Sequence, residues 1–362
     1  MSSRSSPETA GSRTIHDIEL PLRVVIGVNA LNSMPEILRV LGLQNGKIAV
    51  MTGPNVFKLY GEVIEAVLRR GGYEPLFYIV SDASLNTAEK LVGEVLVDKP
   101  AAVVGFGGGK SIDVAKYVSG KVGVHMISVP TSPSHDGIAS PFVSLKGMDR
   151  PYSMKAVTPR AIVADIKIVA EAPLRLIRAG AGDIVGKLTA VRDWELAHRI
   201  KGEYYGEYAA KLARLSAKHV IENASSIGKG TPEGVRILVE ALVSSGVAMC
   251  IAGSTRPASG SEHLFSHALD IVAPGKALHG EQVALGTIMM MYLHGGNWRR
   301  VKRALRELGL PTRASELGLS EDEVLRALLL APKLRPERYT ILGESGLTEN
   351  AARELIRRTG IV

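Results

Sequence analysis

The chain has 362 residues, of which 46% are hydrophobic and 22% are charged, and its formal net charge is +8. This composition excludes a globally disordered or fibrous protein, and the length predicts two domains of roughly 150 to 200 residues each. The single cysteine, Cys250, excludes an intramolecular disulfide framework. The sequence also lacks a long apolar run and an apolar signal peptide. We therefore expect a cytoplasmic protein without stable membrane insertion.

The first predicted feature is a disordered tail over residues 1–14. Short β-branched runs then alternate with amphipathic helical segments up to about residue 170. The runs occupy residues 23–28, 47–53, 74–80, 101–107, 125–130 and 161–169. This alternation is typical of a Rossmann-like, doubly wound parallel sheet, whose ligands bind beyond the carboxyl ends of the strands. We therefore predict a dinucleotide-binding α/β domain over residues 15–170.

Residues 171–362 have a different pattern. Long stretches of helical periodicity are rich in Ala, Leu, Glu and Arg, and contain no convincing strands. We predict an all-α domain here. Because no low-complexity linker separates the two halves, we expect them to share a close interface with a cleft between them.

Two loops of the first half carry candidate cofactor contacts. The stretch GFGGGKSID, residues 105–113, lies between a predicted strand and a predicted helix. Glycine permits positive φ and close backbone approach, and a helix N-terminus attracts phosphate. The hydroxyl-rich loop SVPTSPSHDGIASP, residues 128–141, follows the next strand and faces the same crevice. Because neither spells a complete GxGxxG or P-loop pattern, plain connecting turns remain the alternative.

The second half contains residue types that bind Zn²⁺. Asp183 follows a glycine pair, His263 and His267 lie four residues apart on one helix face, and His279 opens a further helical run. One carboxylate and two imidazoles leave a coordination position open, as in catalytic zinc sites. The alternative is that these are structural polar groups, and the spacing alone does not decide between His263 and His267.

Five motifs carry a resemblance to a known family. In chain order they are GGGKSID, PTSPSHDGIASP, GAGDIVGKLTAVRDWELA, SGSEHLFSHALD and LHGEQVALG, within roughly residues 20–300. Together they resemble the glycerol dehydrogenase and dehydroquinate synthase superfamily. The stretches SHDGIASP and EHLFSHALD point to its archaeal sn-glycerol-1-phosphate dehydrogenase branch. The resemblance implies the dehydroquinate synthase-like fold, in which an N-terminal α/β domain precedes an all-α domain.

The resemblance also implies roles for individual residues. The implied cofactor contacts are Gly107, Gly108, Gly109, Lys110, Ser111 and Asp113 at the pyrophosphate, and Thr131, Ser132, Ser134 and Ser140 at the nicotinamide side. The implied zinc ligands are Asp183, His263 and His279, because the family uses the earlier histidine of the helix. Asp136 and His267 match substrate-contacting positions, with Asp183 near the substrate through the metal. The implied catalytic set is thus Asp183, Asp136 and His267.

The implied reaction is the NAD(P)H-dependent reduction of dihydroxyacetone phosphate to sn-glycerol 1-phosphate, which supplies archaeal membrane phospholipids. Zn²⁺ would polarise the ketone while nicotinamide C4 delivers hydride to C2. No acid follows the strand at 47–53, where Gly53, Pro54 and Asn55 stand, so both NAD(H) and NADP(H) remain open. Lys155 and Arg160 are candidates for binding the substrate phosphate. Related enzymes are usually homo-oligomers, and the scarcity of Asn and Gln indicates a thermophile.

Two alternative activities remain open. A zinc-dependent glycerol or polyol dehydrogenase would share the motifs but need no phosphate site. A dehydroquinate-synthase-like lyase would regenerate NAD within each turnover. A nucleic-acid-binding module is not expected, because Lys and Arg are spread along the chain and aromatic residues make up only 5% of it.

Overall fold

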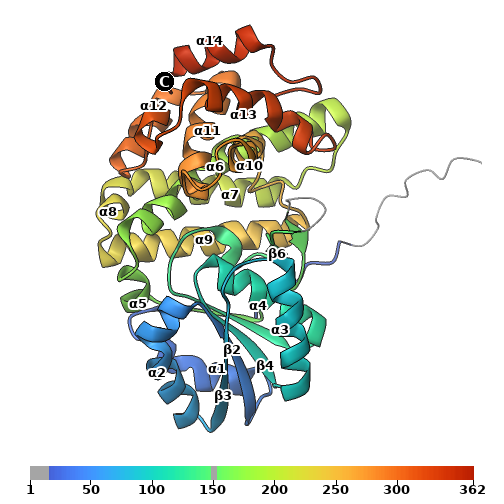
Figure 1. The fold of residues 1–362 in the computed structure, drawn as a ribbon, viewed down its shortest axis with the longest axis vertical. Helices are drawn as coiled ribbons and strands as arrows, with labels where there is room; N and C mark the ends of the chain where they lie inside the picture. Colours follow the sequence, from blue (N-terminus) through green and yellow to red (C-terminus); the bar gives the residue numbers. More distant parts are fainter. Residues whose placement is uncertain (1–15, 148–152) are drawn as a thin grey trace, which may run out of the picture.

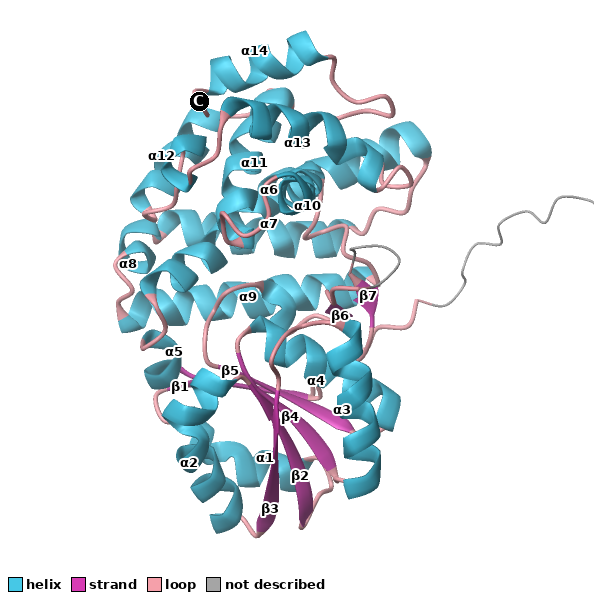
Figure 2. Ribbon diagram, viewed as in Figure 1, coloured by secondary structure: helices cyan, strands magenta, loops and turns pink. Residues whose placement is uncertain are grey.

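A computed structural model of the chain describes residues 16–147 and 153–362. The predicted tail at 1–14 lies outside the described residues. A sheet flanked by helices forms one half of the molecule, and a stack of helices forms the other (Figures 1 and 2).

The predicted parallel sheet is confirmed. Its six strands pair in the order β1-β8-β5-β4-β2-β3, and every pair is parallel. They are β1 (Arg23–Gly27), β2 (Gly46–Thr52), β3 (Tyr73–Ile79), β4 (Ala102–Gly107), β5 (His125–Pro130) and β8 (Ala161–Asp165). From β2 the chain first moves outward to β3 and then crosses to β4 on the other side of β2. The direction of winding therefore reverses between β2 and β4, and ligands of such sheets bind at that point.

Helices cover both faces of the sheet. Along β2, Ile48 and Val50 pack toward one face and Ala49 and Met51 toward the other, as the two-residue period of a strand requires. The first face is covered by η1 (Ala30–Ser33), α1 (Met34–Val40) and α2 (Pro54–Arg70), and the second by α3 (Leu85–Asp98) and α4 (Gly109–Val122). Burial on both faces explains why the strands read as continuous apolar runs.

Two local predictions need correction. The run at 161–169 is not all strand, because β8 ends at Asp165 and α5 (Ile166–Ala170) follows. The Asp165 carboxylate accepts a hydrogen bond from the Lys167 amide at 3.1 Å and so caps this helix. A short antiparallel hairpin of β6 (Phe142–Val143) and β7 (Met154–Lys155) was also not predicted, since two-residue strands carry no readable periodicity.

The second half is helical, as predicted. Its helices are α6 (Leu174–Lys201), α7 (Glu207–Glu222), α8 (Ala224–Gly228), α9 (Pro232–Ala252), α10 (Ser261–Val272), α11 (His279–Leu293), α12 (Trp298–Glu307), α13 (Glu321–Leu334) and α14 (Glu349–Thr359), with η3 (Ala314–Leu317) between α12 and α13. The change from sheet to long helices between residues 165 and 174 supports the proposed domain boundary near 170.

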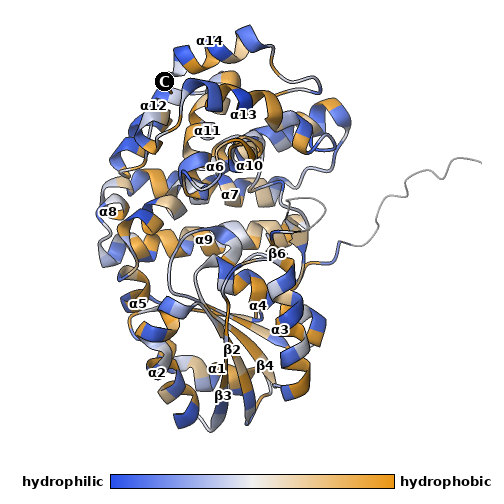
Figure 3. Cartoon of the chain, in the orientation of Figure 1, coloured by the Kyte–Doolittle hydropathy of each residue, from blue (hydrophilic) through white to orange (hydrophobic). Residues whose placement is uncertain are grey.

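Helix α9 is long and apolar enough to cross a membrane by length and composition alone. In the structure, however, 67% of its most apolar 18-residue window is buried inside the protein. Figure 3 shows a largely hydrophobic α9 between the sheet half and the other helices. These are the properties of a core helix.

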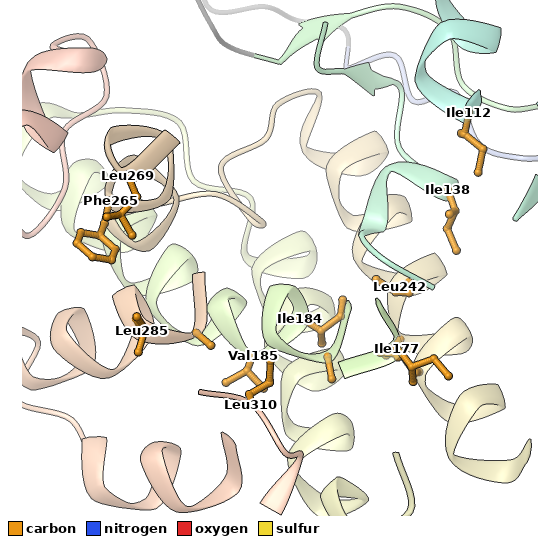
Figure 4. Close-up of a cluster of buried hydrophobic side chains, with 14 of the residues drawn as sticks. Ile112, Ile138, Ile177, Ile184, Val185, Leu242, Phe265, Leu269, Leu285 and Leu310 are labelled. Atoms are coloured by element: carbon orange, nitrogen blue, oxygen red, sulfur yellow. The ribbon is translucent and has the colours of Figure 1, made fainter. Parts of the chain in front are cut away.

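One hydrophobic core joins the two halves. Ile112 of α4 and Ile138 of η2 (Asp136–Ile138) belong to the same buried cluster as Leu242 of α9 and Ile184 of α6 (Figure 4). This shared core holds the end of the sheet that carries the glycine turn against α6 and α9. The loops that follow β4 and β5 therefore lie next to the metal-binding residue types of the helical half.

Candidate active site

The glycine turn lies where the winding of the sheet reverses. β4 ends at Gly107, Gly108 is the N-cap of α4, and β4 is hydrogen-bonded to β2, which Gly53 follows. A Cβ atom at Gly107 would lie 4.0 Å from the Gly53 amide nitrogen and 2.7 Å from Ser111 Oγ. The open amides of the α4 N-terminus therefore lie in the position that binds dinucleotide phosphates in this class of sheet.

Glycine is needed in this turn because other groups lie very close to its backbone, and not because the backbone angles are unusual. Gly107, Gly108 and Gly109 are all absent from the glycines of the described chain that have positive φ. A Cβ atom at Gly109 would lie 1.7 Å from Nε2 of His135. Of the two properties that glycine offers, this turn uses close approach, and the sequence reasoning missed His135, which lies over the turn.

The hydroxyl-rich loop joins the glycine turn to the helical half. The Thr131 amide donates to the Gly107 carbonyl at 2.9 Å, and a Cβ atom at Gly108 would lie 3.0 Å from Ser132 Oγ. At the other side of the loop, a Cβ atom on Gly180 of α6 would lie 1.7 Å from the Pro133 carbonyl oxygen. The loop thus spans the distance from the predicted pyrophosphate site to the helix that carries Asp183.

The remaining residues predicted to contact the cofactor differ in their exposure to solvent. Lys110 is exposed and Ser134 is half-buried, whereas Ser111 and Ser140 are buried. The buried Asp113 carboxylate accepts a hydrogen bond from the Ser144 amide at 3.0 Å and lies 3.1 Å from Lys116 Nζ. The Ser144 contact holds the segment after β6 against α4, and the predicted pyrophosphate contact of Asp113 stays a prediction.

Asp183, His263 and His279 converge as predicted. One ligand atom from each lies within 4.8 Å of the other two. His263 Nε2 is 3.2 Å and His279 Nε2 is 4.0 Å from Asp183 Oδ1. The three residues come from α6, α10 and α11. A Cβ atom on Gly280 would lie 1.8 Å from the Ala179 carbonyl oxygen, so glycine lets the start of α11 touch α6.

Neighbouring side chains fix the orientation of both imidazoles. His263 Nδ1 is 2.7 Å from Glu262 Oε1, so it donates to a carboxylate. His279 Nδ1 is 3.0 Å from Ser266 Oγ, whose own proton is donated to Gln282 Oε1 at 2.6 Å. The Ser266 oxygen therefore accepts a hydrogen bond from the His279 Nδ1–H group. Both rings therefore direct Nε2 toward Asp183, the orientation that metal-binding histidines require.

Lys187 is a site residue that the sequence reasoning missed. It is fully buried, and its Nζ donates to Asp183 Oδ1 at 2.8 Å, to the Ala258 carbonyl at 3.1 Å, and pairs with Asp136 Oδ2 at 2.9 Å. Burial alone would lower the pKa of Lys187, but Asp136 and Asp183 raise it, so Lys187 stays charged. The available signal was the four-residue spacing from Asp183 on one helix face.

The positive charge of Lys187 also affects the pKa of Asp183, one of the three predicted metal ligands. Burial would raise the pKa of Asp183, but Lys187, His263 and His279 bring the pKa well below its ordinary value. Burial and the charge of His263 lower the pKa of His279 well below its usual value. Asp183 and His279 thus hold the protonation states that a metal requires, an ionised carboxylate and a neutral imidazole. Burial lowers the pKa of His263, but its hydrogen bonds to Asp183 and Glu262 outweigh this and raise it, so a bound metal would displace the His263 Nε2 proton.

Asp136 and His267 both lie beside the three predicted ligands. The Asp136 amide donates to Asp183 Oδ2 at 3.2 Å, and Ser245 Oγ donates to Asp136 Oδ2 at 2.8 Å. The His267 ring centroid is 6.4 Å from that of His263 and 6.1 Å from that of His279. Burial and the positive charges of His263, Arg335 and Arg338 lower the pKa of His267 to about 3, which makes it a neutral imidazole.

One of the two candidates for binding a phosphate lies elsewhere. Arg160 precedes β8, and its amide donates to the Met126 carbonyl near the start of β5. It therefore lies at the amino ends of the strands, the edge opposite the glycine turn, and this candidate was wrong. Lys155 is an exposed residue of β7. The arginines that act on His267 are Arg335 and Arg338, which follow α13.

Gly109→Val is expected to raise the KM for the nicotinamide cofactor by roughly 10- to 100-fold, because the branched side chain would displace His135 and the backbone that faces the phosphates. Initial rates at varied cofactor concentration measure this. The matched control is Gly93→Val on the exposed face of α3, where a Cβ atom meets nothing within 4 Å. An unchanged KM for Gly109→Val would favour a plain connecting turn.

Comparisons with known proteins agree with this geometry. Residues 25–173 match the family described as iron-containing alcohol dehydrogenase. The chain is 65% identical over 348 residues to the glycerol-1-phosphate dehydrogenase [NAD(P)+] of Hyperthermus butylicus, which covers 96% of this chain and 99% of that protein. The corresponding enzyme of Staphylothermus marinus is 57% identical over 353 residues, covering 97% and 99%.

Solved structures show the same fold. The glycerol dehydrogenase of Schizosaccharomyces pombe superposes with a TM-score of 0.78 at 21% identity, covering 95% of this chain and 90% of that one. A probable glycerol dehydrogenase of Sinorhizobium meliloti gives 0.77 at 21% identity, covering 95% and 98%. The predicted dehydroquinate synthase-like fold is therefore confirmed.

Proposed function

The chain belongs to the family of NAD(P)-dependent glycerol-1-phosphate dehydrogenases, and from this premise we propose that it reduces dihydroxyacetone phosphate to sn-glycerol 1-phosphate with a bound zinc ion. The observation that carries this proposal is the convergence of Asp183, His263 and His279. We further propose that it acts in the cytoplasm as a homo-oligomer and supplies the glycerophosphate backbone of membrane lipids.

The donor set and the charge of the site fit a divalent cation. When a metal takes the place of the His263 proton, both imidazoles are neutral, Asp183, Asp136 and Glu262 carry three negative charges, and Lys187 carries one positive charge. Two negative charges therefore remain in a buried site, where uncompensated charge is strongly unfavourable. A divalent cation held by Asp183, His263 and His279 would balance them. When bound, Zn²⁺ would polarise the substrate carbonyl oxygen and favour hydride transfer to its carbon.

The chain's own residues orient the substrate. Asp136 is held by Lys187 and Ser245, so its carboxylate is fixed beside Asp183 as an acceptor for the substrate C1 hydroxyl. His267 is a neutral imidazole that lies on the same side of α10 as His263, where it can donate one hydrogen bond to a substrate oxygen.

The glycine turn would hold the cofactor. Gly107, Gly108, Gly109, Lys110 and Ser111 surround the α4 N-terminus, and Thr131, Ser132, Ser134 and Ser140 continue toward α6. The loop therefore leads from the phosphates toward Asp183, as a hydride donor next to the substrate requires. Gly53 and Pro54 start α2 without an acid after β2, which supports use of both NADH and NADPH.

Arg335 and Arg338 are the cations we propose for the substrate phosphate. Arg338 Nη2 donates to Thr255 Oγ1 at 2.7 Å and Nη1 donates to the Ser259 carbonyl at 2.5 Å, and Lys187 donates to the adjacent Ala258 carbonyl. Arg338 therefore lies across one short loop from the predicted metal site, and Arg335 is near enough for its charge to lower the pKa of His267. Guanidinium groups bind phosphate through charge-assisted hydrogen bonds.

Arg335→Gln is expected to lower kcat/KM for dihydroxyacetone phosphate by roughly 10- to 100-fold, since a hydrogen bond to a charged group contributes about 1.5–3 kcal/mol. Activity on free dihydroxyacetone should stay the same, because that substrate has no phosphate. Steady-state rates with both substrates provide the comparison, and Arg326→Gln, on the exposed surface of α13, is the control. An equal loss on both substrates would disprove the phosphate contact.

The proposed function is tested by following NADH or NADPH oxidation with dihydroxyacetone phosphate, with chiral analysis of the product. We expect net cofactor oxidation and sn-glycerol 1-phosphate. A preference for dihydroxyacetone would favour a polyol dehydrogenase instead. Turnover of an alternative substrate without net oxidation of the cofactor would favour a lyase that regenerates NAD.

A further inference from the structure

We propose that a cavity in the helical half, remote from the three predicted metal ligands, binds a phosphate ester with an apolar chain. The cavity has a volume of about 600 Å³ and lies among α6, α7, α11 and α12. Asp183, His263 and His279 do not line it. α7 and α12 can be followed in Figure 1.

Positive charge converges on this cavity from three helices. Its cationic lining residues are Arg192 and Arg199 of α6, Arg214 and Lys218 of α7, and Arg300 of α12, and its one carboxylate is Glu195. Arg192 and Arg199 are seven residues apart on α6, and Arg214 and Lys218 are four apart on α7, so each pair lies along one helix face. The lining therefore carries five positive charges and one negative charge.

Ion pairs do not balance these charges. Glu195 is shared between Arg199 and Arg214, at 2.5 and 4.0 Å, and Lys218 is 3.6 Å from Glu222. Arg192 Nη1 donates to the His294 carbonyl at 3.4 Å. Within residues 16–147 and 153–362, neither Arg192 nor Arg300 has a carboxylate oxygen within 4.0 Å. In a surface network that only stabilises the fold, each cation would have a carboxylate partner. Here unpaired cations line a concave surface, which favours binding of an anion.

The remaining wall of the cavity is apolar. Leu188, Leu196, Ile221, Met291 and Val301 line it. Inorganic phosphate would contact only the cations, whereas an ester of phosphate with a hydrocarbon chain would also cover this wall. The combination of guanidinium groups and aliphatic side chains therefore selects an amphiphilic phosphate.

The cavity adjoins the helix that carries His263 without sharing its ligands. His294 lines the cavity, and its Nε2 lies 3.0 Å from Asp193 Oδ1. Asp193 Oδ2 accepts hydrogen bonds from the Ser261 amide at 2.7 Å and the Ser261 hydroxyl at 2.6 Å, at the start of α10. Because none of the predicted metal ligands lines the cavity, binding there can be measured apart from turnover.

The test is isothermal titration calorimetry of the metal-loaded protein with decyl phosphate below its micelle concentration, and separately with inorganic phosphate and decanol. We expect one site per chain, with decyl phosphate binding at least about tenfold more tightly than either partial probe. The Arg192→Gln, Arg300→Gln double variant should lose at least about tenfold in affinity while keeping kcat, and Arg353→Gln on exposed α14 should lose nothing.

Three controls separate this site from the active site and from a membrane surface. Asp183→Asn should bind decyl phosphate normally, and saturating NADH with dihydroxyacetone phosphate should not displace it. Vesicles that contain phosphatidic acid distinguish a bilayer headgroup, and we expect the protein to bind the dispersed ester and not the vesicles. Displacement by the substrates, vesicle binding alone, or no binding at 1 mM probe would overturn the proposal.

Discussion

Asp183→Asn is expected to lower kcat by at least about 10³-fold, because Lewis-acid stabilisation contributes several kcal/mol and each 1.36 kcal/mol is a factor of ten. The substitution keeps the shape of the side chain but removes the negative charge that Lys187 and both imidazoles face. His279→Ala should have a similar effect, since it removes a second proposed ligand. Zinc content per chain and steady-state turnover measure both results.

The fold and much of the cofactor binding should survive these substitutions. The glycine turn belongs to α4 and β4, which share no residue with the predicted metal ligands. His219→Ala, on the exposed surface of α7, is the matched control and should keep both zinc and activity. Normal turnover by Asp183→Asn after chelation would show that the metal assignment is wrong.

Lys187→Met is expected to lower the free energy of unfolding of the metal-free protein by about 3–5 kcal/mol. The substitution leaves two carboxylates, Asp136 and Asp183, buried without their shared cation. In the zinc-loaded protein the loss should be smaller, because the metal supplies positive charge to Asp183. Denaturant unfolding with and without zinc measures this difference.

The matched control for this substitution is Lys211→Met, whose ion pair with Glu207 is exposed on α7 and should contribute at most about 1 kcal/mol. Lys187→Met should also raise KM for the substrate, since Asp136 would lose one of the groups that hold it. Equal destabilisation with and without zinc would contradict the proposed charge balance between Lys187 and the metal.

Much of this account could be predicted from the sequence because its signals are local. The inner strands of the sheet are buried apolar runs bounded by turns, and most of the motifs stand at the end of a strand or the start of a helix. The position of Asp183, His263 and His279 around one point followed from resemblance. Their spacing along the chain gives no such information, since the convergence depends on how α6, α10 and α11 pack.

Other features depended on tertiary contacts that no local pattern reports. The end of β8 at Asp165 follows from a carboxylate that caps α5 and also accepts the amides of Asn29 and Leu31. Lys187 looks like an ordinary helical lysine until its neighbours are known. Arg335 lies more than 150 residues beyond Asp183, so only the fold brings it toward His267.

The most direct test of the central claim is a crystal structure of the zinc-loaded protein with anomalous differences measured at the zinc absorption edge. One peak per chain is predicted, bonded to Asp183, His263 and His279 at about 2.0–2.2 Å, with one position open toward the glycine turn. A zinc peak held by other residues, or no peak in protein that fully turns over dihydroxyacetone phosphate, would contradict it.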